Sequence, residues 1–148
     1  MITLSTGEAQ KWCLDHGIAL SPRGIPDLSW GVDFERFKIP SDAGQRVALV
    51  RADLQQFKDQ TVLIWIGDYQ VWPSGQWEHL FNQFRKSYGI SDGLNVFPAQ
   101  LIEPEDFDAA ISLAVYSILM LWDCYIIPDS TDRLLFYSHD EYGLKRKS

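Results

Sequence analysis

The sequence predicts a single α+β domain in which a mainly antiparallel sheet is covered by about four helices and ends in a C-terminal β-hairpin. Helical and strand-like patterns alternate along the chain, and the Gly-rich strand-to-helix turns of nucleotide-binding folds do not occur. The 148 residues are the usual length of one domain, and no linker or internal repeat divides them. We therefore expect residues 1–148 to form one domain, with a polar, frayed tail over 143–148.

Two helices are expected in the first half of the chain. The first begins at Ser5, where Ser5-x-x-Glu8 has the form of a capping box, and it ends at Gly17. The second begins after Pro40-Ser41. The apolar stripes are Ala9, Trp12, Cys13 and His16 in the first helix, and Ala43, Val47, Val50, Leu54 and Phe57 in the second. On the second helix we expect Arg46, Asp53 and Lys58 to lie outside the buried face.

Two further helices are expected in the second half. Ser74 can cap the third helix, which ends at Gly89, and Pro104 suits the first turn of the fourth. The third helix has an apolar stripe of Trp77, Leu80, Phe81, Phe84 and Tyr88. The fourth is apolar on every face, so we expect it to pack on more than one side and to make Ile111, Ala114, Val115 and Ile118 nearly inaccessible.

Five segments have strand-like patterns. Val32–Ile39 alternates imperfectly, which indicates an irregular strand, and Leu94–Ile102 is a weaker candidate that Pro98 interrupts. Thr61–Ile66 is a continuous apolar run, as is typical of a central strand covered on both faces. Asp123–Pro128 and Arg133–Ser138 are expected to form the hairpin.

The negative charge of the chain is concentrated in one segment. Gly89–Leu144 contains ten carboxylates and one base, Arg133, whereas Met1–Tyr88 is almost neutral with ten acids and nine bases. A surface of this sign repels nucleic acid and attracts a basic protein. We therefore expect no nucleic-acid partner and consider a basic protein as the partner, while the oligomeric state stays open.

Composition also bears on the location of the protein. The start of the chain lacks the positive and apolar regions of a secretory signal, and the longest apolar stretch, Ala109–Trp122, is too short to span a bilayer. Cys13 and Cys124 have no metal-ligand spacing, so we expect two reduced, buried thiols. Together these features predict a cytoplasmic protein without a membrane partner.

The segment Ser138–Tyr142 (SHDEY) is the one place in the sequence where a histidine and carboxylates crowd together. His139 with Asp140 or Glu141 could form an acid–base or metal site, but neighbouring residues of an extended chain point to opposite faces. If the segment turns instead, we expect Asp140 to accept hydrogen bonds from backbone amides, and Tyr142 to pack on the sheet.

Three other residues are candidates for function. Asp123, at the entrance to the hairpin, would either hold neighbouring amides or belong to the acidic surface. Trp72 and Trp77 flank a turn, where either one indole enters the core beside a helix cap, or the two form an aromatic contact surface with Trp72 half exposed. No zinc, nucleotide or nucleophile motif occurs, so we expect no cofactor and name no catalytic or metal-binding residue.

Four blocks of the sequence together resemble a family of small uncharacterised bacterial proteins. The blocks are Trp72-Pro73-Ser74, Arg85-x-Ser87-Tyr88-Gly89, Trp122-Asp123-x-Tyr125 and the SHDEY segment, within a stretch from Val47 to Tyr142. The SHDE block is also similar to the ends of small acidic proteins encoded beside bacterial toxins. The resemblance implies no activity, cofactor or catalytic residue.

These observations lead to three hypotheses of function. The first is a binding module, such as an immunity-type inhibitor that covers a basic toxin, because opposite charge speeds such an encounter. The second is a small hydrolase or isomerase that uses His139 with nearby carboxylates, which requires a concave pocket and a shifted pKa. The third is a structural subunit of a larger assembly. The sequence favours the first, which is not an enzyme, and leaves the question of an enzymatic activity open.

Overall fold

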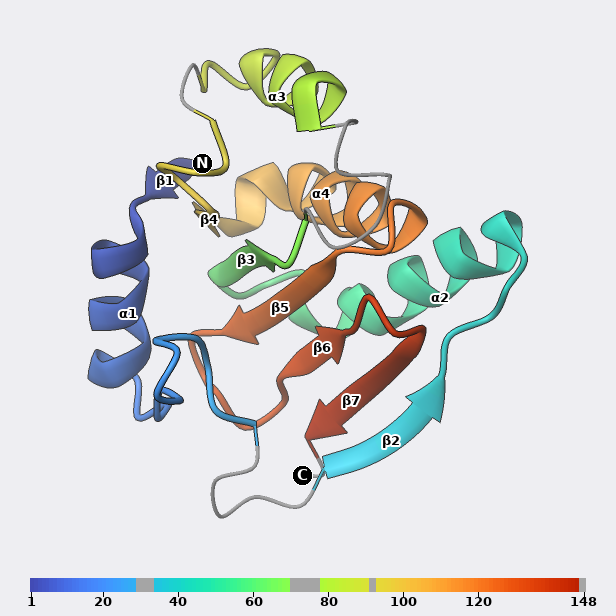
Figure 1. Cartoon of the computed structure of the whole chain (residues 1–148), viewed down its shortest axis with the longest axis horizontal. Helices are drawn as coiled ribbons and strands as arrows, with labels where there is room; N and C mark the ends of the chain where they lie inside the picture. The colour runs from blue at the N-terminus through green and yellow to red at the C-terminus, as the bar shows by residue number, and fades with distance from the viewer. Residues whose placement is uncertain (29–33, 70–77, 91–92, 147–148) are drawn as a thin grey trace.

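The chain folds around one seven-stranded antiparallel sheet, as a computed structural model shows (Figure 1). The structure describes residues 1–28, 34–69, 78–90 and 93–146. The strands lie in the order β1-β4-β3-β5-β6-β7-β2. Their bounds are Ile2–Leu4 (β1), Phe34–Lys38 (β2), Val62–Gly67 (β3), Ala99–Ile102 (β4), Asp123–Pro128 (β5), Leu135–Tyr137 (β6) and Tyr142–Arg146 (β7). The predicted α+β class and the hairpin of β5 and β6 are confirmed.

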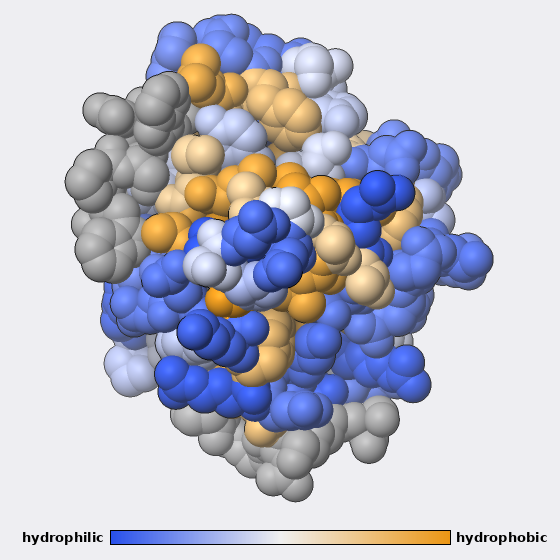
Figure 2. Space-filling view, turned by 90° about the vertical axis from the view of Figure 1, so that its right-hand side faces the viewer, coloured by the Kyte–Doolittle hydropathy of each residue, from blue (hydrophilic) through white to orange (hydrophobic). Residues whose placement is uncertain are grey.

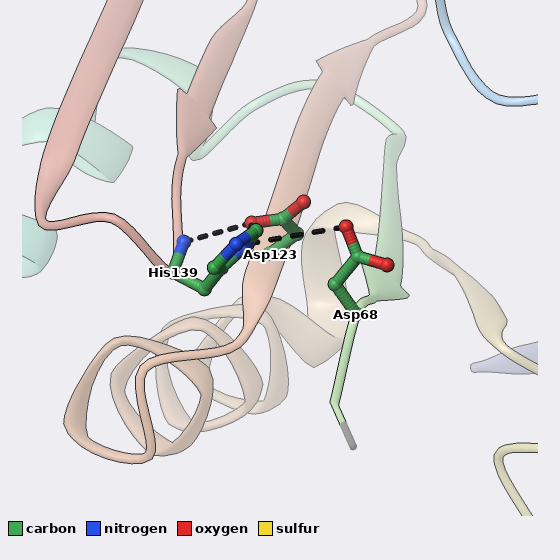
Figure 3. Close-up of side chains that lie close together, drawn as sticks. All are labelled: Asp68, Asp123 and His139. Atoms are coloured by element: carbon green, nitrogen blue, oxygen red, sulfur yellow. Dashed lines mark hydrogen bonds and ion pairs between the residues drawn. The ribbon is translucent and has the colours of Figure 1, made fainter. Parts of the chain in front are cut away.

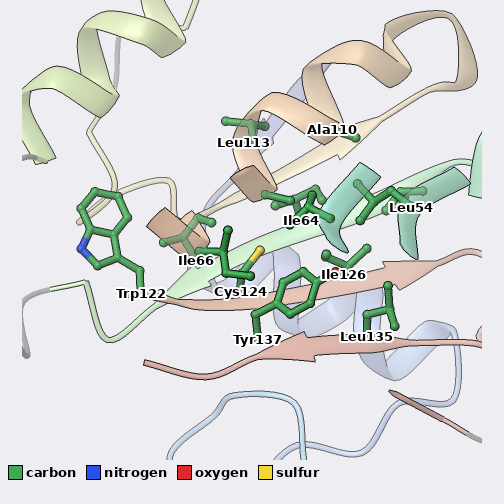
Figure 4. Packing of buried hydrophobic residues seen from close by; sticks show 14 of the residues in the cluster. Leu54, Ile64, Ile66, Ala110, Leu113, Trp122, Cys124, Ile126, Leu135 and Tyr137 are labelled. Carbon is green, nitrogen blue, oxygen red and sulfur yellow. The ribbon is translucent and has the colours of Figure 1, made fainter. Parts of the chain in front are cut away.

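Helices cover both faces of this sheet. They are α1 (Thr6–Asp15), α2 (Ala43–Leu54), α3 (Glu78–Lys86) and α4 (Phe107–Leu119), with short 3-10 turns at Gln55–Phe57 and Pro104–Asp106. The larger buried cluster lies between the sheet and α2 and α4, and its side chains include Leu54, Ile64, Leu113, Ile126 and Tyr137 (Figure 4). The smaller cluster lies between the other face and α1.

Strand β3 confirms the prediction of a central strand. Leu63 and Trp65 belong to the cluster under α1, whereas Ile64 and Ile66 belong to the cluster under α2 and α4. Successive side chains of a strand point to opposite faces, so a strand covered on both faces needs apolar residues at every position. The continuous apolar run of β3 therefore follows from its place between β4 and β5.

The capping box that predicts α1 is present. The Ser5 hydroxyl accepts from the Glu8 amide at 3.2 Å, and the Glu8 carboxylate accepts from the Ser5 amide at 2.7 Å. Gly17, with φ +76°, follows the C-cap residue His16. This end therefore uses the left-handed conformation that glycine adopts without strain.

Two expectations for the buried faces of helices are wrong. On α2, Arg46 and Asp53 are buried and Ala43 is exposed, because both charged side chains have partners inside the fold, which are described below. On α4, Ala114 and Ile118 are buried as expected, but Ile111 and Val115 are only partly so. Figure 2 shows hydrophobic residues reaching the surface on the side of the molecule where α2, α3 and α4 lie.

The expectation of a frayed tail over 143–148 is also wrong for the residues that the structure describes. Residues 143–146 are part of β7, which pairs with β6 on one side and β2 on the other. The prediction was wrong because it relied on the polar side chains of this segment. The strand is held by backbone hydrogen bonds and by the packing of Gly143 against the ring of Phe37. Residues 143–146 thus belong to an internal strand of the sheet.

Several smaller expectations can be compared with the structure. Cys13 and Cys124 are both buried and unpaired, as predicted. Within the described ranges, every helix is too short or too polar to traverse a bilayer. The predicted cap Ser74 and the start of the strand at Val32 lie outside the described residues.

Candidate functional site

Two carboxylates and a histidine meet where three strands of the sheet end or begin. Asp68 follows the last residue of β3, Asp123 is the first residue of β5, and His139 lies two residues after β6. The strand pairing places these positions together, because Gly67 is opposite Asp123, and Cys124 is opposite Tyr137. Figure 3 shows the three side chains directed toward one another.

Asp123 fixes both the backbone and the ring of His139. Its Oδ1 atom accepts a hydrogen bond from the His139 amide at 2.8 Å and lies 2.7 Å from the ring nitrogen Nδ1. Only 7% of the Asp123 side chain is exposed. Of the two roles considered for Asp123, the structure has the one in which its carboxylate holds a backbone amide, and a carboxylate in this position also sets the orientation of the imidazole.

Asp68 completes the group from the other side. Its Oδ2 atom lies 3.9 Å from His139 Nδ1, and its Oδ1 atom lies 3.4 Å from an Arg23 guanidinium nitrogen. The backbone of Asp68 has φ +46°, in the left-handed region that residues with a side chain adopt at a cost. Strain of this kind is often found where a side chain must be held in a functional position.

The surroundings shift the proton affinity of two of these groups. Burial raises the pKa of Asp123 to about 6, against the lowering effect of its hydrogen bonds with His139, and a side-chain hydrogen bond with Asp68 adds to the rise. Burial by itself lowers the pKa of His139, but the hydrogen bond with Asp123 and the charges of Asp123, Asp140 and Asp68 outweigh it and raise the pKa. The site therefore concentrates negative charge around one imidazole.

The three side chains line an open pocket of about 570 Å³. One wall is the sheet, with Tyr125, Phe136, Tyr142 and Leu144, and the opposite wall is the loop after α1. The loop contributes Arg23, Ile25, Pro26 and Leu28. The charged group thus stands at one part of a pocket whose other walls are largely apolar, as is usual for sites that bind small molecules.

Asp68, Asp123 and His139 could hold a metal ion. Each offers one ligand atom, and these atoms all lie within 4.8 Å of one another. Ligands that surround one ion at about 2.0–2.2 Å are separated by roughly 3 to 4 Å. His139 Nδ1 lies 3.9 Å from Asp68 Oδ2 and 2.7 Å from Asp123 Oδ1, so an ion would replace the hydrogen bond between His139 and Asp123 and move these two groups slightly apart. Among the described residues this is the one cluster of three such side chains.

The structure separates the candidates that the sequence grouped together. Asp140 lies at the rim, 63% exposed, with Oδ1 3.6 Å from His139 Nε2. In the described part of the chain no backbone amide donates to Asp140, which instead donates its own amide to the Ser138 hydroxyl, so the expected capping role is wrong for this residue. Glu141, with φ +64°, binds Arg46 at 2.7 Å outside the site. Tyr142 packs edge-on against Phe136, as predicted.

Sequence reasoning missed Asp68 and could not test two other candidates. The sequence does carry one indication of a role for Asp68, namely that this carboxylate directly follows a buried strand. Trp72 and Trp77 lie outside the described residues. Comparison of the chain with family models, curated proteins and solved structures gave no match. The resemblance to a bacterial family therefore stays a prediction.

Proposed function

We propose that this chain is a small hydrolase in which Asp68, Asp123 and His139 bind a divalent metal ion. The observation that carries the proposal is the convergence of three ligand atoms within 4.8 Å at the wall of a pocket. The three residues come from distant parts of the sequence, so their meeting is a product of the fold. This is the geometry that the second hypothesis from the sequence required, with the addition of Asp68.

A divalent cation accounts for features that are costly without one. Two carboxylates that share a partly buried site repel each other, and burial together with a hydrogen bond to Asp68 raises the pKa of Asp123 to about 6. A cation between them relieves that repulsion. The left-handed backbone of Asp68 would direct its carboxylate toward the ion. Two carboxylates with one imidazole suit borderline or hard ions such as Zn²⁺ and Mn²⁺.

The arrangement favours hydrolysis as the reaction. Three protein ligands leave a coordination position for water, and a bound divalent ion lowers the pKa of that water toward neutrality. If Nδ1 of His139 binds the ion, Nε2 directs its N–H toward Asp140, 3.6 Å away. Carboxylates in this second position orient a ligating histidine and raise its basicity.

Metal binding can be tested directly by titrating Mn²⁺ and Zn²⁺ into the purified protein in a calorimeter. We expect one site per chain. Asp68→Asn, Asp123→Asn and His139→Gln should each weaken binding by at least about tenfold, since each removes a ligand. Asp132→Asn, an exposed carboxylate in the β5–β6 turn, is the matched control and should bind as the wild type does. If the wild-type protein binds neither Mn²⁺ nor Zn²⁺, the proposal is refuted.

The hydrogen bond between Asp123 and His139 favours a second candidate function. At 2.7 Å, Asp123 would hold His139 for proton transfer without a metal ion, in an acid–base hydrolase or isomerase. The two candidates differ in their response to a chelator. Activity on a panel of nitrophenyl esters and phosphates that survives EDTA, and is lost in His139→Gln, would favour the metal-free site.

The hypothesis of an acidic binding module called for one continuous acidic face. Carboxylates of the acidic segment instead lie at both ends of strand β5. Asp123 and Asp140 lie at the pocket, whereas Glu103 and Asp129 both contact Thr61 beyond the opposite end of β5. A six-residue strand separates the two ends by roughly 20 Å. Immunity-type inhibition of a basic toxin therefore stays a prediction from charge alone.

A further inference from the structure

We infer that the substrate of this pocket is a phosphate ester of an aromatic or apolar alcohol. This inference rests on the proposed function and names its substrate class. The phosphate would bind between the metal ion and Arg23, while the alcohol part would lie against the apolar walls. Three observations support it: the composition of the sheet wall, the position of Arg23, and the charge of the site with a metal ion bound.

Aromatic rings form a continuous wall beside the charged group. Tyr125 and Phe136 stack with their centroids 4.6 Å apart, and Tyr142 meets Phe136 edge-on at 6.3 Å. Tyr125 and Phe136 are themselves buried, so Tyr142, which is partly buried and has one ring face covered by Arg36, is the ring of this series that a ligand can reach. With Leu144 and the loop residue Ile25, it provides a surface on which a flat apolar group can lie.

One arginine lines the pocket, and a second supports the Tyr142 ring from outside it. Arg23 reaches toward Asp68 with 72% of its side chain exposed, which leaves its guanidinium accessible to a ligand. Arg36 lies over the Tyr142 ring, 4.0 Å from its centroid, and so holds the ring in place by a cation–π contact. A planar guanidinium beside a metal ion is well suited to a phosphate, because it can donate two parallel hydrogen bonds.

A bound metal ion neutralises the charge of the pocket. Without it, the carboxylates of Asp68, Asp123 and Asp140 outnumber the one arginine of the lining, Arg23. With it, the divalent ion and Arg23 supply three positive charges against those three negative ones. The metal-loaded pocket thus no longer repels an anion, although the whole chain has a net charge of -7.

The reaction balances as a simple hydrolysis. With the ion bound, the oxygen of a water molecule held at it would form a bond to phosphorus and lose one proton to the solvent, while the bond between phosphorus and the alcohol oxygen would break. The alcohol oxygen keeps the electron pair and takes up a proton, so the products are the alcohol and inorganic phosphate. Arg23 would neutralise the charge that develops on the phosphoryl oxygens.

The test compares two ligands on the protein loaded with Mn²⁺. Calorimetry should show that phenyl phosphate binds about tenfold more tightly than inorganic phosphate, since the ring removes apolar surface from water. Arg23→Gln should weaken both ligands. Tyr142→Leu and Ile25→Ser should reduce the preference for phenyl phosphate and leave phosphate binding and Mn²⁺ binding unchanged. Arg51→Gln, an exposed arginine on α2, is the matched control and should change neither.

The outcomes separate this inference from the proposed function. If Mn²⁺ does not bind, the proposed function fails. If Mn²⁺ binds with the expected dependence on Asp123, yet both ligands bind equally or Arg23→Gln has no effect, only the substrate class is wrong. Tyr142→Leu and Ile25→Ser lie on different segments, so a folding defect in one variant leaves the other to decide. Wild-type protein that hydrolyses nitrophenyl phosphate only with Mn²⁺ would extend the support to catalysis.

Discussion

The carboxylate of Asp53 on α2 accepts a hydrogen bond of 2.8 Å from the Tyr137 hydroxyl on β6. The same carboxylate binds Lys145 on β7 at 2.6 Å. Burial, and then the charge of Asp53, raise the pKa of Tyr137 well above its usual value, so its hydroxyl stays a donor. One buried side chain of α2 is therefore satisfied by two neighbouring strands of the sheet.

Removal of this carboxylate should destabilise the fold. Asp53→Ala leaves the buried Tyr137 hydroxyl without its acceptor and separates Lys145 from its charge partner. We expect a loss of about 1–3 kcal/mol in the free energy of unfolding, the usual cost of an unsatisfied buried group. Chemical denaturation followed by circular dichroism measures it. The control is Asp59→Ala, an exposed carboxylate shortly after α2, and equal stability of the two variants would contradict this account.

Strand β7 depends on the absence of a side chain at Gly143. A methyl group built there would overlap the ring of Phe37. Gly143→Ala should therefore cost about 1–3 kcal/mol, the usual range for overpacking a core. Phe37→Leu replaces the ring by a smaller side chain. It should therefore recover part of that loss when the two changes are combined.

Gly7→Ala is the control for this substitution. A methyl group at Gly7 meets no atom within 4 Å, and alanine is the better helix former, so this variant should be as stable as the wild type or more so. A Gly143→Ala protein with wild-type stability would show that β7 does not lie against Phe37.

The parts of the fold that were predictable from the sequence are those that local chemistry determines. The capping box at Ser5 and the doubly covered strand β3 need only neighbouring residues to be recognised. The errors share a different origin. Arg46 and Asp53 look like solvent-facing residues until Glu141, Tyr137 and Lys145 are known to reach them from the far end of the chain.

The candidate site was predictable only in part for the same reason. Asp123 and His139 are conspicuous in the sequence, but their 2.7 Å contact follows from the pairing of β5 with β6. Asp68 had no such signal, because its relation to Asp123 depends on β3 lying beside β5. Asp140 and Glu141, adjacent to His139 in sequence, have separate surroundings, since the turn before β7 directs them apart.

Helix α4 gives a prediction about the core. Ile118 is 2% exposed and belongs to the cluster between the sheet and α2 and α4, whereas Ile111 on the same helix is only partly buried. Ile118→Ala should cost roughly 2–5 kcal/mol, since it removes apolar contacts and leaves a cavity. Ile111→Ala should cost less, and denaturant midpoints of the two variants measure the difference. Equal midpoints would mean that the two faces of α4 are equally buried.

The two cysteines give a prediction about reactivity. Burial raises the pKa of both Cys13 and Cys124 to about 12. Because the thiolate is the reactive form, at pH 8 only about one part in ten thousand of each native thiol is ionised, against roughly a quarter of an ordinary exposed thiol. Native protein should thus react with a chromogenic disulfide reagent only as fast as it unfolds, while protein in guanidinium should release two equivalents at once. A thiol that reacts immediately in the native state would show that one cysteine is accessible, and Cys13→Ala and Cys124→Ala would identify which.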